Sequence, residues 1–536
     1  MTKDKLDYVK NIIKLFESLK EYNYLRNLFM NSNRTNIINK IFIFNTIRSF
    51  RNIFDRELFL GKILALNGAK VIILLDDGIL NHWDTYQYDH FHKNENFIQK
   101  SLNPYYYTSR NRFQFINKFL KNILLKRAKK VYIDKNLRYV YYSDIISKDN
   151  LISNFQILEK LQKYAKSSTI RFFKTSELDF NNKYVKYYYL LSLQNALLSY
   201  NVGNFILNHI NPDYFITSHG IYSTWGPAYD YMRENNSKSF VYAGKHSHTI
   251  NPHDIYFTDA KVQTLSRSTF WKKYKNREVT NEMEEKVKRI FKSRIYHSTK
   301  DTLIYYNGDI KKFEFKKDLM KCNIGIFPNL IWDGNIEDRH KIFKGIIEWL
   351  TETINFLKDN KGIQIFLKFH PAETTIFKNS PQIQNIMEKK IDIKCIKNLK
   401  IIPSDSKINT YKFLKDYVDF GIVYDGILAL EMPFLKIPTL LGGYKGRFSV
   451  NGGNFTVSNK KEYFKHLENV RKTIELFHKD FDIFYKNIIR YSYWYFYKNV
   501  LKLPTLSNGI SYGTNLLKLR LNDIELDNKL LEILEI

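Results

Sequence analysis

Residues 323–329 read NIGIFPN, and residues 339–371 read RHKIFKGIIEWLTETINFLKDNKGIQIFLKFHP. The first stretch, and IQIFL near the end of the second, are short apolar runs typical of strands buried on both faces of a parallel sheet. Between them, apolar side chains from Ile342 to Leu357 recur at the spacing of one helix face. A strand, a helix and a second strand in this order predict a parallel α/β unit.

The same alternation extends in both directions from this unit. It continues through DFGIVY (419–424) and IPTLLGG (437–443), and in the first half it appears at IFIFN (41–45), KVIILLDDG (70–78) and PDYFITSHG (212–220). Two such series in one chain predict two Rossmann-like domains. We therefore expect an N-terminal helical segment over residues 1–39, a first domain over 40–290 with a helical insertion at about 93–175, a second domain over 320–465, and C-terminal helices over 466–536 that pack back across both domains.

The composition is that of a folded intracellular protein. Of the 536 residues, 44% are hydrophobic and 16% aromatic, whereas disordered chains lack apolar and aromatic residues. The two cysteines, Cys322 and Cys395, are far apart, which argues against a disulfide framework and against a thiolate metal site. The amino terminus lacks the pattern of a signal peptide, and no run of about 18 apolar residues predicts a membrane-spanning helix. We expect a cytoplasmic protein.

The chain is strongly basic. Lys and Arg total 84 against 54 Asp and Glu, which gives a net charge of +30. A charge of this size attracts polyanions of any kind, including nucleic acid, nucleotides and an anionic membrane face. The basic residues are spread along the chain instead of forming one arm, so a biased genome composition explains them equally well. The charge alone leaves the partner open.

A polar segment follows the strand IQIFL. In open parallel sheets, ligands bind beyond the carboxyl ends of the strands. Here Lys368, His370, Pro371 and Glu373 stand at such an end. Histidine can donate a hydrogen bond to a phosphate oxygen, proline fixes the turn that presents it, and lysine adds a positive charge. The alternative is a merely structural turn.

A second polar segment follows the strand DFGIV. A helix begins near Gly426, directly after Asp425, and its free backbone N–H groups can bind a phosphate. Glu431, further along this helix, can reach a ribose hydroxyl. The alternative makes Glu431 a solvated helix residue.

The first half offers candidates for a general base. His219 follows the strand YFIT, and Asp76 and Asp77 follow the strand KVIILL. Each can take a proton from a substrate hydroxyl. The alternatives are a buried, hydrogen-bonded histidine and an ordinary Asp-Gly turn.

Metal and cofactor motifs are missing from the sequence. His246 and His248 do not predict a metal site, because side chains two residues apart on a loop converge poorly and no third ligand is identifiable. There is no P-loop, no GxGxxG after the first strand, no HExxH and no GxSxG. ATPase, dehydrogenase, zincin and α/β-hydrolase functions therefore lack their usual support.

The second half resembles a known enzyme family. Its segments FPNLIWDG, FLKFHPAE and INTYKFLKDYVDFGIVYDGILALEMPFLKIPTLLGG are similar to capsule and surface-polysaccharide glycosyltransferases of GT-B fold. In that family an Asn-x-x-Trp-Asp segment, a His-Pro-Ala-Glu segment and a Glu-containing donor helix occur in this order. The resemblance covers about residues 323–466 and extends more loosely to the first half. It implies a GT-B-like α/β fold, with the two domains facing each other across a cleft.

The resemblance also implies which residues hold the donor. Asn329, Trp332 and Asp333 match the start of the donor domain, and His370 and Glu373 match its phosphate region. Asn409 and Thr410 would lie near the nucleotide, and Asp425 and Glu431 near its sugar moiety. The sequence departs from the family at Asp425-Gly426-Ile427, where Ser or Thr residues usually face the phosphates, and at Leu435–Pro438, where Gly-Lys-Pro is common. The leaving nucleotide is therefore open among CMP, CDP, UDP and GDP.

The activity implied is metal-independent and needs no cofactor. A sugar would move from a nucleotide-activated donor to a capsule or lipopolysaccharide glycan, or to a lipid-linked glycan, with peripheral contact at the inner face of an anionic inner membrane. A polyol-phosphate (teichoic-acid-type) transferase is the alternative within enzymes. A basic, non-catalytic scaffold that binds nucleic acid or membrane is the alternative from another class, although no single-strand recognition motif is visible, so no specific nucleic acid is expected.

Overall fold

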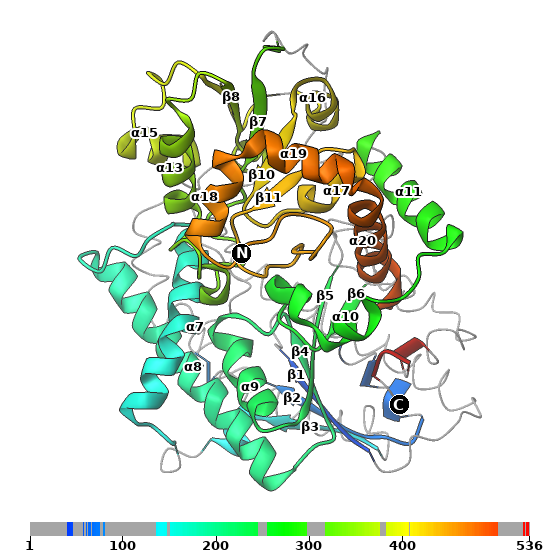
Figure 1. Ribbon diagram of the computed structural model, residues 1–536. Helices are drawn as coiled ribbons and strands as arrows, with labels where there is room; N and C mark the ends of the chain where they lie inside the picture. The colour runs from blue at the N-terminus through cyan, green and yellow to red at the C-terminus, as the bar shows by residue number, and fades with distance from the viewer. Residues whose placement is uncertain are drawn as a thin grey trace, which may run out of the picture.

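The computed structural model describes residues 40–46, most of 57–75, 79–80, 136–146, 151–244, 255–296, 317–375, 382–406, 408–501 and most of 529–534. Within them the chain forms two α/β domains, one above the other in Figure 1. The expected helical segment 1–39, residues 93–135 of the expected insertion, and the candidates Asp76, Asp77, His246 and His248 lie outside the described residues.

The first domain is built on a mainly parallel sheet. Its strands are β1 (Ile41–Thr46), β2 (Lys70–Leu75), β3 (Leu137–Tyr141), β4 (Tyr214–Ser218), β5 (Lys238–Gly244), β6 (Ile255–Thr258) and β12 (Val500–Leu501). Their order is β12-β6-β5-β4-β1-β2-β3, and β1 to β5 run parallel. The strands β6 and β12 extend one edge in antiparallel fashion. The edge strand β3 lies inside the stretch 93–175, and its exposed Arg138 explains why no apolar run marks it in the sequence.

Helices of the first domain pack closely on one another. Three that contact one another are α7 (Phe155–Phe173), α8 (Lys183–His209) and α9 (Tyr222–Glu234). Gly203 allows α8 to approach α9, because a Cβ at this position would lie 3.1 Å from the Cα of Ala228. The other described helices in this part of the chain are α6 (Tyr142–Ile145), the 3-10 helix η2 (Val262–Arg267), α10 (Thr269–Tyr274) and α11 (Asn281–Ile295).

The second domain repeats the arrangement with a wholly parallel sheet. Its strands are β7 (Cys322–Phe327), β8 (Ile363–Lys368), β9 (Leu399–Ile402), β10 (Phe420–Val423) and β11 (Thr439–Leu441), in the order β11-β10-β7-β8-β9. Counting strands from the start of each domain, the described strands of both sheets contain the order 3-2-1-4-5 of a doubly wound fold. The order reverses between β7 and β10, and this is where such folds bind ligands.

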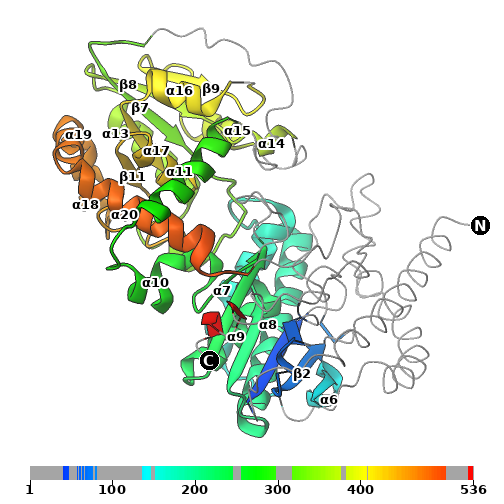
Figure 2. The ribbon, with the colours of Figure 1, turned by 90° about the vertical axis from the view of Figure 1, so that its right-hand side faces the viewer.

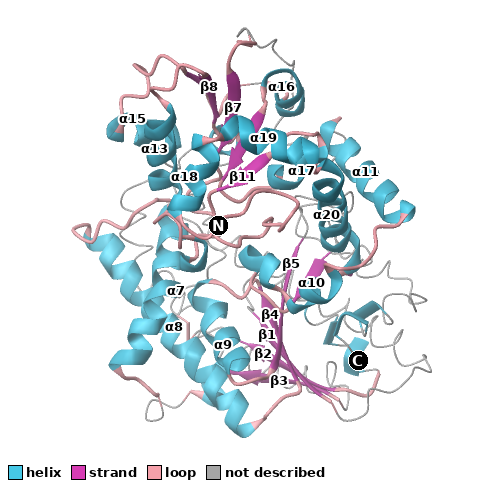
Figure 3. Cartoon of the chain, in the orientation of Figure 1, coloured by secondary structure: helices cyan, strands magenta, loops and turns pink. Residues whose placement is uncertain are grey.

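The described helices of the second domain and of the segment that follows it are the 3-10 helix η3 (Glu337–Arg339), α13 (Ile346–Leu357), α14 (Ala372–Thr375), α15 (Ile383–Lys390), α16 (Thr410–Tyr417), α17 (Leu428–Phe434), α18 (Lys460–Glu468), α19 (Val470–Lys479) and α20 (Phe481–Tyr493). Helices lie on both sides of the second sheet, with α13 and α15 on one side and α16 and α17 on the other in Figure 3. Trp349 of α13 is buried and its Nε1 donates a 2.8 Å hydrogen bond to the Tyr463 hydroxyl of α18.

The domains are interlocked through α11 and α20. Helix α11 follows the first domain in sequence but packs against α20, beside the second domain, as Figure 2 shows. From α20 the chain passes through a π-helical turn at Trp494–Lys498 into β12, which pairs with β6 of the first sheet. The GT-B-like α/β fold of two Rossmann-like parallel-sheet domains is therefore confirmed. Among the described helices, none is both long and apolar enough to cross a lipid bilayer.

Candidate functional site

A cavity of about 320 Å³ lies at the carboxyl ends of the second sheet. It sits at the point where the strand order reverses, because segments after β7, β8 and β10 all reach it. The loop after β11 and the start of α16 complete the wall, and Gln263 and Arg294 come from segments that precede the second domain. Of the residues expected from the sequence, those lining the cavity are Asn329, Asp333, Lys368, His370, Pro371, Thr410, Asp425, Gly426 and Glu431.

Lys368 brings a buried positive charge to this wall. It is the last residue of β8, and its side chain is buried. Burial lowers the pKa of the Lys368 amine to about 8, because the charged form is poorly solvated there. Among the described residues, no carboxylate forms an ion pair with Lys368. The amine is therefore a cation without a fixed counter-ion.

His370 is held in one tautomer. The backbone N–H of Ala372 donates a 3.1 Å hydrogen bond to His370 Nδ1, so the neutral ring carries its proton on Nε2. Burial and the charge of Lys368 lower the pKa of His370 to about 4, although Asp333 acts in the opposite direction. His370 is thus a neutral N–H donor at pH 7.

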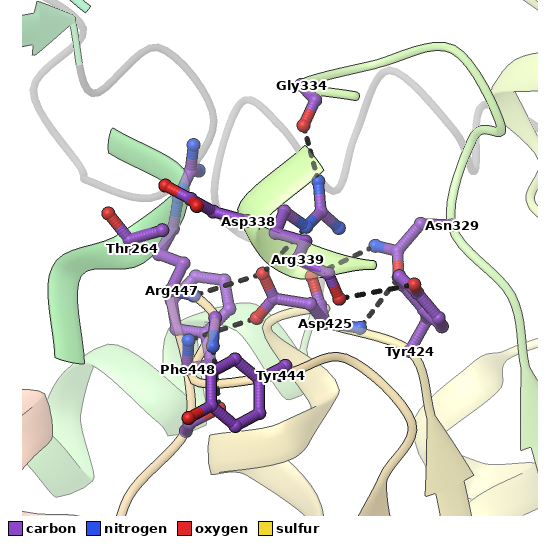
Figure 4. A network of polar contacts seen from close by, with 12 residues as sticks. Thr264, Asn329, Gly334, Asp338, Arg339, Tyr424, Asp425, Tyr444, Arg447 and Phe448 are labelled. Carbon is purple, nitrogen blue, oxygen red and sulfur yellow. Dashed lines mark hydrogen bonds and ion pairs between the residues drawn. The ribbon is translucent and has the colours of Figure 1, made fainter. Parts of the chain in front are cut away.

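Asn329 joins the loop after β7 to the loop after β10. Its Nδ2 donates to the Asp425 carbonyl at 3.2 Å, and its Oδ1 accepts from the Asp425 N–H at 3.1 Å (Figure 4). Gly426 fits beneath this amide, since a Cβ there would lie 3.2 Å from Asn329 Nδ2. Both loops are therefore fixed relative to each other at the reversal point.

The Asp425 carboxylate organises the loop after β11. It accepts hydrogen bonds from the backbone N–H groups of Arg447 at 3.0 Å and Phe448 at 3.1 Å, and Arg339 Nε lies 3.4 Å away. Gly446 is required here, because a Cβ would come within 2.4 Å of the carboxylate. Arg447 Nε in turn donates a 3.0 Å bond to the Val262 carbonyl of the first domain. Asp425 thus has donors of its own within the protein.

Glu431 is also paired. This buried residue of α17 forms an ion pair with Arg294 of α11 and accepts a 2.9 Å hydrogen bond from the Tyr411 hydroxyl. Its other oxygen, Oε2, is buried without a hydrogen-bond partner. A solvated helix residue, the sequence alternative for Glu431, is excluded by its 1% exposure.

Two expected residues point away from the cavity. Glu373 Oε2 accepts a 3.2 Å hydrogen bond from the N–H of Ile383 at the start of α15, and burial raises the pKa of Glu373 to about 7. Asn409 caps α16, since its side chain accepts from the Lys412 N–H at 3.0 Å. Both residues act on helix ends, and only the neighbouring Thr410 faces the cavity.

His219 lies outside the cavity wall. It follows β4 in a left-handed conformation, its ring stacks on Trp225, and its Nδ1 is 2.5 Å from Ser218 Oγ. Its carbonyl accepts from the Val262 N–H at 3.4 Å, and Val262 contacts Arg447 across the domain interface. His219 is therefore near the interface without lining the cavity. Among the described residues, no three His, Cys, Asp or Glu side chains are grouped as a metal site.

Four polar residues of the cavity were missed by sequence reasoning. Arg447 belongs to the loop after β11, where the sequence pattern predicts a strand end, whereas Arg339 lies in η3, further from the end of β7. Gln263 and Arg294 follow no second-domain strand, and only the packing of the domains brings them to the site. The Gln263 Oε1 atom is buried without a hydrogen-bond partner.

No protein-family model matches the sequence, and no curated protein matches it. The structure is similar to the β-Kdo 2,4-transferase KpsC of Thermosulfurimonas dismutans, with 14% identity, 47% of this chain and 75% of that chain covered, and a TM-score of 0.33. It is similar to S. aureus MnaA, solved with UDP, at 11% identity, 85% and 94% coverage, and a TM-score of 0.25. It is similar to the wall teichoic acid polymerase TagF at 17% identity, with 32% of this chain and 39% of that chain covered and a TM-score of 0.21.

Proposed function

We propose that the protein is a glycosyltransferase that binds a nucleotide-activated sugar in this cavity. The observation that carries the proposal is the pair at the end of β8. Lys368 supplies a positive charge without a carboxylate partner among the described residues, and His370 supplies an N–H donor of fixed tautomer. A phosphate group matches both, because phosphate oxygens accept charge-assisted hydrogen bonds.

The charge balance of the wall favours an anionic ligand. Each of the three carboxylates that line the cavity, Asp333, Asp425 and Glu431, has an arginine within ion-pair distance, so their charges are compensated within the protein. Lys368 is then left to attract the ligand. Fixed donors of this kind stabilise the negative charge that develops on a leaving phosphate without having to reorganise. This supports sugar transfer with a nucleotide as the leaving group.

The acceptor in this proposal is a bacterial capsule or lipopolysaccharide glycan, as the resemblance of the motifs implies. The net charge of +30 supports attraction of the donor and peripheral contact with an anionic membrane face. The donor nucleotide is one of CMP, CDP, UDP and GDP, and the reaction needs neither a metal ion nor a cofactor.

The test is a thermal-shift screen with CMP, CDP, UDP and GDP, each with and without Mg²⁺. A ligand that binds only the folded protein raises the melting temperature. We expect one nucleotide to do so independently of Mg²⁺, and His370→Ala to abolish the shift. His478→Ala, a change of an exposed histidine on α19, is the matched control and should keep the shift.

The absence of a shift with all four nucleotides would contradict the proposal. Analysis of the product then separates the related activities, because a polyol-phosphate transferase leaves phosphorus in its product whereas a sugar transferase does not. Strong, salt-dependent binding of nucleic acid without nucleotide binding would instead favour the basic scaffold.

A further inference from the structure

Three carboxylates line the cavity, and one differs from the other two. The side chains of Asp425 and Glu431 are only 2% exposed, and each is surrounded by donors from the protein. The side chain of Asp333 is 57% exposed. Among the described residues, the cation that forms an ion pair with its carboxylate is Arg171, at 3.4 Å. Among these carboxylates, Asp333 is therefore the one whose oxygens are accessible to a ligand.

The backbone at Asp333 is fixed on both sides of the domain interface. Gly334 donates its N–H to the Tyr222 hydroxyl of the first domain at 3.3 Å, and its carbonyl accepts from Arg339 at 2.8 Å. Gly334 has a φ of +57°, and a Cβ there would collide with the Gln263 amide at 2.1 Å. Because the chain is held in this way, the Asp333 side chain leaves the backbone at a defined point between the two domains.

The position of Asp333 suits the reacting end of a bound donor. Lys368 and His370 lie in the same cavity wall, and the charge of Asp333 reaches the His370 ring. Arg171, which contacts Asp333, belongs to α7 of the first domain. The carboxylate thus stands between the proposed phosphate site and the domain from which an acceptor would enter.

We propose that Asp333 is the general base of the transfer reaction. This rests on the proposed function. An Asp333 oxygen takes the proton of the acceptor hydroxyl as the acceptor oxygen forms its bond to the anomeric carbon. The bond between that carbon and the phosphate oxygen breaks, and its electron pair leaves with the nucleotide. The protonated Asp333 then returns its proton to water. In this proposal Asp333 has the role for which the sequence offers His219, Asp76 and Asp77 as candidates.

The experiment compares Asp333→Asn with Asp338→Asn. Asp338 is a matched control, because it lies in the same segment, pairs with an arginine of the first domain at 3.6 Å, and is outside the cavity wall. The assay uses nucleotide sugars of the stabilising nucleotide with octyl glycosides as acceptors, and measures nucleotide release. We expect Asp333→Asn to lower kcat at least about 100-fold with an unchanged nucleotide-induced thermal shift. The kcat of Asp338→Asn should stay within about twofold of the wild-type value.

Chemical rescue gives a second readout that a structural role would not produce. Added formate can replace the missing carboxylate in Asp333→Ala, so it should raise nucleotide release by this variant and leave the unchanged protein unaffected. Normal kcat in Asp333→Asn would overturn the proposal. So would equal losses in Asp333→Asn and Asp338→Asn, which would assign the effect to domain contacts. Failure of every nucleotide to stabilise the protein would instead count against the proposed function itself.

Discussion

The side-chain amide of Asn329 pairs with both backbone polar groups of Asp425, donating at 3.2 Å and accepting at 3.1 Å. Strands β7 and β10 are paired in the sheet, and the Asn329 amide connects the two loops that follow them.

Asn329→Ala should destabilise the second domain and weaken nucleotide binding. The change leaves the N–H and carbonyl of Asp425 without their partners, which costs about 1–3 kcal/mol. Urea denaturation measures the loss of stability, and thermal shifts measure the loss of binding. Asn355→Ala, on an exposed position of α13, should change neither. If both variants behave alike, the amide pair has no special role.

Nucleotide affinity should fall as the pH rises through about 8. The Lys368 pKa of about 8 means that the amine is charged below this pH and loses its charge above it. Phosphate groups are already ionised above pH 7, so they do not contribute to the change. We expect about a tenfold loss of affinity between pH 7 and pH 9.5, measured by calorimetry. Lys368→Arg, which stays charged, should show no such fall.

Glu373→Gln should stabilise the protein at alkaline pH. Burial raises the pKa of Glu373 to about 7 from its ordinary value of 4.5, so the folded state binds this proton more tightly than the unfolded state. The stability linked to the proton is fully present below pH 4.5 and is lost as the pH rises through 7. Each unit of the pKa difference corresponds to about 1.4 kcal/mol. The free energy of unfolding of the variant, taken relative to the wild-type protein, should therefore be about 1–3 kcal/mol higher at pH 8 than at pH 5. A difference in unfolding free energy that does not change with pH would contradict this.

Arg294→Met should lower the free energy of unfolding by about 3–5 kcal/mol. The change leaves the Glu431 carboxylate buried without its cation. The double variant Arg294→Met, Glu431→Leu should recover part of the loss, because it removes the uncompensated charge. Lys288→Met breaks a partly exposed ion pair with Glu284 on the same helix and should change the free energy of unfolding little, because solvent screens such a pair. Equal losses in Arg294→Met and Lys288→Met would argue against a special role for the buried pair.

Much of the second domain could be predicted from its sequence because strands buried on both faces leave near-continuous apolar runs. The same logic located the site, since parallel strands such as β8 and β10 place their ends along one edge. For this reason the sequence points to Lys368, His370 and Asp425, and all three line the cavity. The edge strand β3 was missed because its side chains meet solvent as well as the core.

The direction of single side chains could not be predicted in this way. Glu373 is three residues after His370, yet the turn into α14 directs it toward the start of α15. Arg294 is distant in sequence from the other cavity residues and reaches the site only because α11 packs on the second domain. Such positions depend on tertiary packing, which leaves no local signal in the sequence.

The return of the chain to the first sheet at β12 makes the second domain an internal insertion within the first. The chain enters it through α11 and leaves it through α20. A single proteolytic cut in either connection would leave the two domains joined through the other. For the same reason, exchange of the second domain between related genes would need two crossover points. The cavity residues of the second domain would then be exchanged together with the sheet that carries them.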